Sequence, residues 1–373
     1  MATALRARLD VEVEDIDVCA YTIPVDADEP ESDGTLAWDS TTIVVVEAHG
    51  GGRTGLGYTY ADASAAVFVE SKLAGEVRGA DALAPGAAWR RMAAAIRNAG
   101  RPGLGFMALS AVDVALWDLK ARLLELPLHR LLNPFHDRVP VYGSGGFTSY
   151  SLERLAEQLA GWVERGIPRV KLKVSRHPDR DPERLAAVRD AIGPEPVLMV
   201  DSNGALTRKE ALHWAWRFRE EWNVAWFEEP VSSADLVGLR LLRDQGPPGL
   251  DVAAGEYGYV LRDFVNLLEA QAVDCLQADV TRCGGITGLL QVAGLAAAHQ
   301  IDLSAHCAPA VSAHAFCAVE RLRHLEFFHD HDRVERLLFD GTLDPEDGFL
   351  RPDPGRPGLG LELKRADAEE YRA

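Results

Sequence analysis

From residue 139 onward, short hydrophobic strand patterns alternate with amphipathic helix patterns. The first strand pattern is VPVYGSGGF, and the helix pattern that follows it, SLERLAEQLAGWVERG, has an apolar side and ends at Gly166. Seven further strand patterns follow, nearly all separated by helical stretches: RVKLKV, VLMVDSN, AWFEEPV, DVAAGEY, DCLQADV, DLSAHCA and HLEFF. Eight strands with these separations predict an α/β fold with a parallel barrel.

The first ~130 residues have a different pattern, strands first and helices after. Residues 10–24 alternate as a half-buried strand does, residues 41–48 are β-branched, and residues 55–61 complete an antiparallel meander. Helical patterns follow at 63–78, 85–99 and 107–125. We therefore expect an α+β domain at 1–130, the barrel at 131–340, and a Gly- and Pro-rich extended segment at 341–373 that packs back on the first domain.

Polar or ionisable residues stand at the ends of successive predicted strands. After Lys171 and Lys173 the intervals are 28, 27, 28, 23, 27 and 20 residues, which lead to Asp201, Glu228, Glu256, Asp279, His306 and Glu326. One strand, one helix and two loops need about 25 residues, so each interval is one β/α unit. In a closed barrel these groups converge on one mouth. An open doubly wound sheet, the rival fold, places active groups at only one or two switch points.

Three of these strand-end residues are carboxylates, from Asp201, Glu228 and Glu256. Hard oxygen donors without an added His or Cys ligand favour Mg²⁺ over zinc. A single strand-end carboxylate more commonly caps a helix or pairs with arginine, but three in step with the repeat favour a metal site. Asn203 lies two residues after Asp201, so its side chain is expected on the same face of the strand, where it would orient a ligand or the substrate. Glu229 directly follows Glu228, so it is expected on the opposite face, behind the metal ligands.

The remaining strand-end groups suggest proton transfer. Lys171 and Lys173 point to the same side of one strand, and each is expected to lower the proton affinity of the other. An isolated lysine pair is more often a solvated strand rim, but here apolar residues flank both lysines. Asp279 can raise the proton affinity of His306, which would act as acid or base on the opposite face. Glu326 could donate a hydrogen bond to an enolate oxygen, or simply pair with Arg321 or Arg323.

Composition narrows the classes of partner. The net charge of −18 argues against nucleic acid or an anionic membrane, and the longest apolar strand, 42–46, is too short to cross a bilayer. The N-terminus has no apolar stretch of signal-peptide length, so a cytoplasmic location is expected.

The five cysteines form no CxxC pair and are expected to be reduced and buried. Cys307 follows His306 directly, and on a strand it would point to the opposite face, which argues against a Cys/His nucleophile.

The segment CGGITG at residues 283–288 is similar to a phosphate-binding loop at a helix N-terminus. Glycine pairs also serve close turns, and no Lys-Ser/Thr partner follows them, so the signal is weak. It supports a rival class, a phosphate-binding barrel enzyme such as an aldolase with a Schiff-base lysine.

With these residues assembled, the chain resembles the enolase superfamily and, within it, the mandelate racemase subgroup. The resemblance spans the whole chain and rests on KLK (171–173), DSN (201–203), FEEP (227–230), AGE (254–256), QADVTRCGGITG (277–288), SAH (304–306) and LEFF (325–328). It implies a modified (β/α)₇β barrel with an N-terminal α+β capping domain. It also implies that Asp201, Glu228 and Glu256 bind Mg²⁺.

The resemblance further implies the roles of the other groups. Lys173 is expected to be one base, with Lys171 lowering its pKa and steadying the substrate carboxylate. The Asp279–His306 pair is the acid or base of the other face, and Glu326 donates to the enolate. Capping loops 21–40 and 49–58 are expected to select the substrate, with Tyr21 and Trp38 as candidate contacts.

The reaction implied is Mg²⁺-dependent removal of the proton next to a carboxylate, giving an enediolate. Dehydration of an aldonate or aldarate to a 2-keto-3-deoxy acid ranks first, and racemisation or epimerisation of a 2-hydroxy acid is the alternative. A catalytically silent relative that binds a sugar acid is a remote third. The resemblance also implies a homo-oligomer, a dimer or an octamer.

Overall fold

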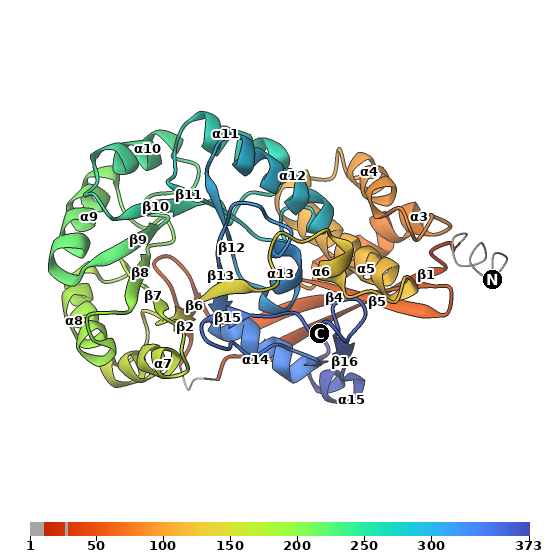
Figure 1. The fold of residues 1–373 in the computed structure, drawn as a ribbon, viewed down its shortest axis with the longest axis horizontal. Coiled ribbons are helices and arrows are strands. Elements are labelled where there is room, and N and C mark those ends of the chain that lie inside the picture. Colours follow the sequence, from red (N-terminus) through yellow and green to blue (C-terminus); the bar gives the residue numbers. More distant parts are fainter. Residues whose placement is uncertain (1–10, 27–28) are drawn as a thin grey trace.

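The structure, a computed structural model, describes residues 11–26 and 29–373. Residue 10, where the first strand pattern begins, lies outside them. Eight parallel strands form a closed barrel (Figure 1), because the last strand pairs with the first, Glu326 opposite Tyr142. The strands are β6 (Val139–Gly145), β7 (Arg169–Lys173), β8 (Val197–Asp201), β9 (Val224–Glu228), β10 (Asp251–Ala254), β11 (Cys275–Ala278), β12 (Asp302–Ala305) and β13 (Leu322–Phe328). The predicted parallel barrel is confirmed.

A helix follows each of the first seven strands and lies outside the barrel (Figure 1), which is the (β/α)₇β arrangement. Side-chain caps fix where some of these helices begin: Ser151 accepts from the backbone N–H of Arg154, and Thr207 and Glu210 form a reciprocal capping box. The helices are α7 (Leu152–Glu164), α8 (Asp181–Ile192), α9 (Arg208–Trp222), α10 (Leu236–Gln245), α11 (Leu261–Glu269), α12 (Gly285–Ala298) and α13 (Pro309–Phe316). After β13 the chain continues into α14 (His329–Leu338).

The N-terminal part is the predicted α+β cap. Its sheet has the antiparallel order β1 (Asp15–Pro24), β4 (Ser40–Gly50), β5 (Arg53–Tyr60). The acidic loop between β1 and β4 contains a small hairpin, β2 (Glu31–Ser32) with β3 (Ala37–Trp38). The pattern at 63–78 is a continuous helical segment of α2 (Ser64–Phe68), η1 (Val69–Leu73) and α3 (Ala74–Val77), followed by α4 (Pro85–Ala95), η2 (Arg101–Gly105) and α5 (Phe106–Leu123).

Helix α5 lies directly on β5. A Cβ atom at Gly55 would come within 2.2 Å of the backbone nitrogen of Leu119, and one at Gly57 within 2.2 Å of the carbonyl oxygen of Ala111. These two glycines therefore allow the close approach of helix and strand. The segment Arg101–Leu123 is also long and apolar enough to cross a membrane by composition, but 72% of its apolar window is buried within the protein. That burial is typical of the core helix of a globular protein.

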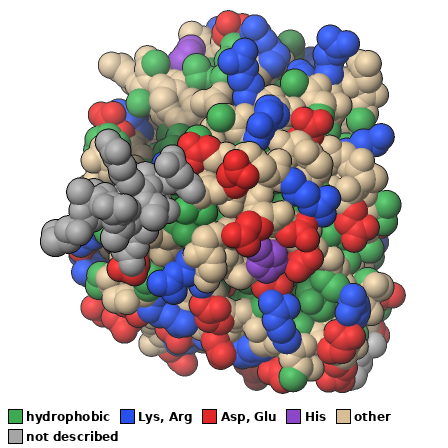
Figure 2. Space-filling model, turned by 90° about the vertical axis from the view of Figure 1, so that its right-hand side faces the viewer, with side chains coloured by type: hydrophobic (Ala, Val, Ile, Leu, Met, Phe, Trp, Pro, Cys, Tyr) green, Lys and Arg blue, Asp and Glu red, His purple; other side chains and the backbone are tan. Residues whose placement is uncertain are grey.

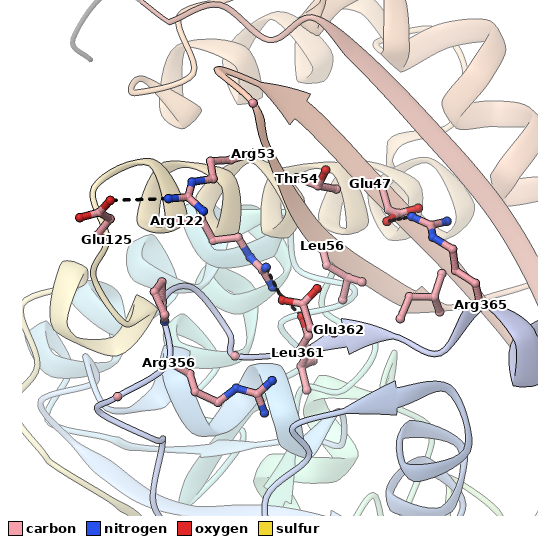
Figure 3. A pocket seen from close by; sticks show the side chains of 15 residues that line it. Glu47, Arg53, Thr54, Leu56, Arg122, Glu125, Arg356, Leu361, Glu362 and Arg365 are labelled. Atoms are coloured by element: carbon pink, nitrogen blue, oxygen red, sulfur yellow. Dashed lines mark hydrogen bonds and ion pairs between the residues drawn. The ribbon is translucent and has the colours of Figure 1, made fainter. Parts of the chain in front are cut away.

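The C-terminal segment runs back to the cap (Figure 1). It contains β14 (Phe339–Asp340), β15 (Phe349–Leu350), β16 (Glu362–Leu363), α15 (Arg365–Ala368) and η4 (Glu369–Tyr371), and α6 (Leu128–Leu131) lies against it. The backbone N–H of Leu359 donates to Asp118, and that of Ala373 donates to the carbonyl of Ala20. Where the segment meets the cap sheet, a cavity of about 470 Å³ is crossed by the ion pairs Arg122–Glu362 and Arg365–Glu47 (Figure 3).

The surface of the cap carries both signs of charge. On the face in Figure 2, Asp and Glu side chains lie among Lys and Arg side chains rather than beside a continuous basic field. This distribution agrees with the net charge of −18.

Candidate functional site

A cavity of about 380 Å³ lies at the carboxyl ends of the barrel strands, beneath the β2–β3 hairpin of the cap. Six of the residues singled out from the sequence line it, namely Trp38, Lys173, Asn203, Glu256, His306 and Glu326. Four others are buried beside them and contact them: Lys171, Asp201, Glu228 and Asp279. The strand-end residues therefore converge as the barrel geometry predicts.

Asp201, Glu228 and Glu256 form a compact carboxylate cluster on β8, β9 and the loop after β10. One oxygen from each lies within 4.8 Å of the others, and all three residues are buried. The Oε2 atom of Glu256 is buried, and Nε2 of His306 lies 3.1 Å from it. Like charges at this spacing repel unless a cation lies between them, so the donor set fits a hard divalent ion such as Mg²⁺.

The two lysines of β7 contact this cluster. Nζ of Lys173 lies 2.5 Å from Oδ2 of Asp201, and Nζ of Lys171 lies 2.6 Å from Oε1 of Glu228. Burial by itself lowers the pKa of Lys173 and so does Lys171, as expected from the sequence, but Asp201 and the other carboxylates together raise it. Lys171 is fully buried beside the cavity, so its expected contact with the substrate carboxylate stays a prediction.

His306 stands across the cavity on the loop after β12. Its Nδ1 lies 2.8 Å from Oδ2 of Asp279, whose Oδ1 accepts from both the backbone N–H and the hydroxyl of Thr281 at 2.7 Å. This contact leaves Nε2 facing Glu256 and Glu326, 3.1 and 3.6 Å away. Burial alone would lower the pKa of His306, but the surrounding acidic groups raise it well above its ordinary value.

Glu326 differs from its expected role as a hydrogen-bond donor. Its Oε1 accepts from Ser144 at 2.6 Å and lies 2.7 Å from Nζ of Lys171. Burial raises the pKa of this carboxyl, but the charges of Lys171 and His306 outweigh burial and lower it. Glu326 is therefore an acceptor that orients Lys171 in this structure.

Asn203 and Glu229 flank the carboxylate cluster. The backbone N–H of Asn203 donates to Oδ1 of Asp201 at 2.8 Å, and its own Oδ1 is buried without a partner among the described residues. Asn203 lines the cavity, as predicted from its position two residues after Asp201. Glu229 is buried, and its oxygens do not belong to the set that converges within 4.8 Å.

Two expectations about the cap are wrong. Tyr21 is buried on β1, where it bridges to Arg372 of the C-terminal segment, and it does not line the cavity. Loop 49–58 is the far turn of β4 and β5 and borders the cavity of Figure 3 instead. The opposite ends of the same strands, Thr41, Thr42 and Ala61, reach the barrel mouth, because an antiparallel hairpin directs its turn away from its open end. Within loop 21–40, Trp38 does line the cavity.

Sequence reasoning discounted Cys307 and missed Arg282. Cys307 follows the end of β12 with φ +51°, so strand alternation does not apply and its Sγ lies 3.4 Å from both Nε2 of His306 and Oε2 of Glu326. The reason given for separating Cys307 from His306 is therefore wrong, although burial raises the pKa of the thiol and keeps it neutral. Arg282 lies 3.6 Å from Glu256 and 3.4 Å from Asp279, and only its position three residues after Asp279 could have indicated it.

The glycine-rich segment 283–288 binds a helix of the cap rather than phosphate. The backbone N–H groups of Gly284 and Gly285 donate to the hydroxyl of Ser110, at 2.9 and 3.0 Å. The carboxylate of Asp113 accepts from the backbone and the hydroxyl of Thr287. Side chains of α5 therefore take the donors at the start of α12, which removes the basis for the aldolase reading.

Comparison with known proteins agrees with this geometry. Residues 21–133 match the family model for the mandelate racemase/muconate lactonizing enzyme N-terminal domain, and residues 154–368 match the enolase C-terminal domain-like model. A solved mandelate racemase/muconate lactonizing enzyme-like protein from Rubrobacter xylanophilus has 67% sequence identity and a TM-score of 0.95, over 97% of this chain and 100% of its own.

Two further relatives have assigned reactions. The 3,6-anhydro-alpha-L-galactonate cycloisomerase of Streptomyces coelicolor is 32% identical over 94% of this chain and 97% of its own length. The L-talarate/galactarate dehydratase of Salmonella typhimurium, solved with Mg and L-lyxarohydroxamate, has 28% identity and a TM-score of 0.88, over 98% of this chain and 94% of its own. This chain belongs to the mandelate racemase/muconate lactonizing enzyme family of the enolase superfamily.

Proposed function

We propose that this protein is a Mg²⁺-dependent acid-sugar dehydratase, which converts a polyhydroxy acid to a 2-keto-3-deoxy acid. The observation that carries the proposal is that two proton-transfer groups, Lys173 and His306, line one cavity together with a carboxylate cluster. Relatives that dehydrate acid sugars, and one that is solved with Mg, support the same assignment.

Asp201, Glu228 and Glu256 are the proposed metal ligands, since one oxygen of each lies within 4.8 Å of the others and all three residues are buried. Mg²⁺ held there would supply positive charge that offsets the three carboxylates and the negative charge that develops on the substrate. Asn203, whose backbone N–H holds Asp201, is proposed to present its unpaired Oδ1 to a hydroxyl of the substrate.

One of Lys173 and His306 removes the proton from the carbon next to the substrate carboxylate. The electron pair of that C–H bond forms the enediolate double bond. The hydroxyl on carbon 3 then leaves with the C–O electron pair, and the opposite group of the two gives it a proton, so that water is released. The enol that remains tautomerises to the 2-keto-3-deoxy acid.

Three neighbours position these two groups. Asp279 accepts from Nδ1 of His306 and so leaves Nε2 as the nitrogen that exchanges the proton. Nζ of Lys171 lies 2.6 Å from Oε1 of Glu228 and 2.7 Å from Oε1 of Glu326, so it bridges the two carboxylates. It also adds a second positive charge behind Lys173. In this proposal Glu326 orients Lys171, and Arg282 orients Glu256 and Asp279.

A racemase or epimerase is the second candidate, because the same pair of groups can act in sequence. If one group removes the proton and the other returns a proton to the same carbon, configuration is inverted and no hydroxyl is lost. The substrate decides, since dehydration needs a hydroxyl on carbon 3.

Proton NMR tests the proposal directly. The purified protein with Mg²⁺ in D₂O is incubated with pooled aldonic and aldaric acids and, separately, with 2-hydroxy acids. We expect a new 3-deoxy methylene signal. Loss of the α-proton signal without a new skeleton would favour racemisation or epimerisation, and no change in any pool would contradict both.

Variants identify the groups that carry the reaction. Lys173→Ala and His306→Ala are each expected to lose dehydration, while Lys209→Ala, which removes an exposed lysine on α9, is expected to keep it. Full turnover in either of the first two would refute the mechanism.

Several expectations from the sequence stay predictions. They are the domain limits 1–130, 131–340 and 341–373, a cytoplasmic location, a homo-oligomer of two or eight copies, and the absence of nucleic-acid and membrane partners. Size-exclusion chromatography with light scattering measures the oligomer.

A further inference from the structure

The ionisable residues of the cavity wall form two groups, a barrel end with both acidic and basic side chains and a far end whose charged side chains are acidic. Lys173 and Arg282 lie at the barrel end, with the carboxylate cluster and His306. The far end is formed by the cap and by the start of α14, with Asp33, Leu36, Trp38, Ser40, Thr41, Thr42, Asp62, Asp330 and His331 in its wall. Among the described residues, no lysine or arginine belongs to this far end.

From this division we infer that the substrate carries a single carboxylate and an uncharged, hydroxylated far end, which makes it an aldonate rather than an aldarate. The inference deepens the proposed function and rests on it. With its carboxylate at the metal cluster, an aldarate would place its second carboxylate near the buried Asp330, with the more exposed Asp33 and Asp62 at the rim of the same cavity. Unpaired like charges in a confined site oppose binding, whereas sugar hydroxyls can use the carboxylates as acceptors.

Asp330 is fixed in the wall and cannot easily turn away. Its Oδ2 accepts from the indole Nε1 of Trp38 at 3.0 Å and from the hydroxyl of Thr41 at 3.3 Å. The residue is almost fully buried. Glu31, on the hairpin behind it, is also buried, and burial followed by the charge of Asp330 raises the pKa of Glu31 to about 8. Glu31 is therefore mainly protonated near neutral pH and adds no charge of its own behind the cavity wall.

The histidine at this end supplies a hydrogen bond and no charge. Nδ1 of His331 accepts from the backbone N–H of Ala308 at 3.2 Å, and the ring stacks on Tyr60 with centroids 3.4 Å apart. Burial lowers the pKa of His331 to about 3. The neutral ring therefore carries its proton on Nε2, where it can donate to a hydroxyl of the substrate.

Three arginines that contact residues 24–36 are engaged outside the cavity. Arg154 contacts Asp26 at 2.9 Å, Arg176 donates to the carbonyl of Leu36, and Arg333 donates to the carbonyl of Pro24. None of the three belongs to the cavity wall. They hold the loop that carries the far end, and they are not positioned to receive a second carboxylate.

Matched substrate pairs test the inference on the wild-type protein with Mg²⁺. D-gluconate is compared with D-glucarate, and D-galactonate with galactarate, because each pair differs only at the far carbon. We expect kcat/KM to be at least about 100-fold higher for the aldonate of whichever pair reacts, mainly through KM. Preference for the aldarate with normal dehydration would overturn the inference alone. Absence of both dehydration and α-proton exchange with every acid would overturn the proposed function together with it.

A variant that introduces a positive charge gives an independent test. Leu36 is 61% exposed at the tip of the hairpin and lines the far end, so Leu36→Arg adds a cation there without altering the core. The aldonate-to-aldarate ratio of kcat/KM is expected to fall at least about 10-fold in Leu36→Arg and to stay unchanged in Leu36→Met, the neutral control. Asp330→Asn should shift the ratio in the same direction by removing a charge. Unchanged ratios in both Leu36→Arg and Asp330→Asn would contradict the inference.

Discussion

The imidazole Nδ1 of His306 lies 2.8 Å from Oδ2 of Asp279, and this contact leaves Nε2 as the nitrogen that faces Glu256 and Glu326. Asp279 is itself fixed by the backbone and hydroxyl of Thr281. The histidine is thus held in one orientation and one tautomer, as a group that transfers protons must be.

Asp279→Asn is expected to abolish this arrangement while keeping the fold. An amide cannot support the imidazolium as the carboxylate does, so kcat should fall by about 10²- to 10⁴-fold. Exchange of the α-proton in D₂O should be lost for substrates that His306 deprotonates and kept for those that Lys173 deprotonates. Equal loss of both exchanges, at an unchanged melting temperature, would show that Asp279 does not act through His306.

Magnesium is expected to stabilise the protein through Asp201, Glu228 and Glu256. Binding to the folded state alone raises the melting temperature with increasing metal concentration, and a chelator should reverse the increase. Glu228→Gln should remove most of this response, because one of the three converging oxygens loses its charge.

Glu229→Gln is the matched control for this experiment. It changes the adjacent residue of the same type, whose oxygens are outside the converging set. Its response to Mg²⁺ should stay close to that of the wild type. A wild-type melting temperature that does not depend on Mg²⁺ would refute the metal assignment.

The sequence predicts most of the barrel and its chemistry, because a parallel β/α barrel repeats one unit and brings all strand ends to one mouth. The positions of Lys173, Asp201 and His306 follow from that repeat. The contributions of the cap do not, because they depend on how one domain lies on the other. Tyr21 and loop 49–58 were misassigned for this reason.

Local backbone geometry explains the other differences. Cys307 adopts a left-handed conformation immediately after its strand, which the alternation rule cannot anticipate. The donors of Gly284 and Gly285 appear free in the sequence, since Ser110, their acceptor, lies 174 residues from Gly284 along the chain. The far end of the cavity, including Asp330 and His331, is likewise assembled from segments distant in sequence.

Glu335 is expected to make stability depend on pH. It is buried on α14, where it accepts from the hydroxyl of Tyr58 at 2.5 Å and from the backbone N–H of Ala310 at 3.0 Å. Burial raises the pKa of this carboxyl to about 8. The folded protein then holds a proton that the unfolded chain has released, so this contribution is complete at acidic pH and is lost as the pH rises through about 8.

Urea unfolding of the wild type and of Glu335→Gln measures this contribution. The difference in the free energy of unfolding between the two proteins should change by an amount on the order of 3 kcal/mol from about pH 5 to about pH 8, with the wild type losing stability relative to the variant. Glu221→Gln, which changes an exposed glutamate on α9, should show no such change. Parallel stability curves for the wild type and Glu335→Gln would contradict the assignment.

The docking of α5 on the start of α12 should contribute strongly to stability, and two glycines of α12 test it. Gly285 has φ +69°, and a Cβ atom there would lie 2.5 Å from Oδ2 of Asp113. Gly285→Ala therefore strains the backbone and displaces the carboxylate that accepts from Thr287. We expect a loss of about 2–4 kcal/mol in the free energy of unfolding.

Gly294 lies in the same helix, and a Cβ atom there would meet nothing within 4 Å. Gly294→Ala should instead gain about 0.5–1 kcal/mol, because alanine loses less backbone entropy in a helix. Denaturant titration of both variants gives the comparison. Equal effects in the two would mean that the contact between Asp113 and α12 does not stabilise the join between cap and barrel.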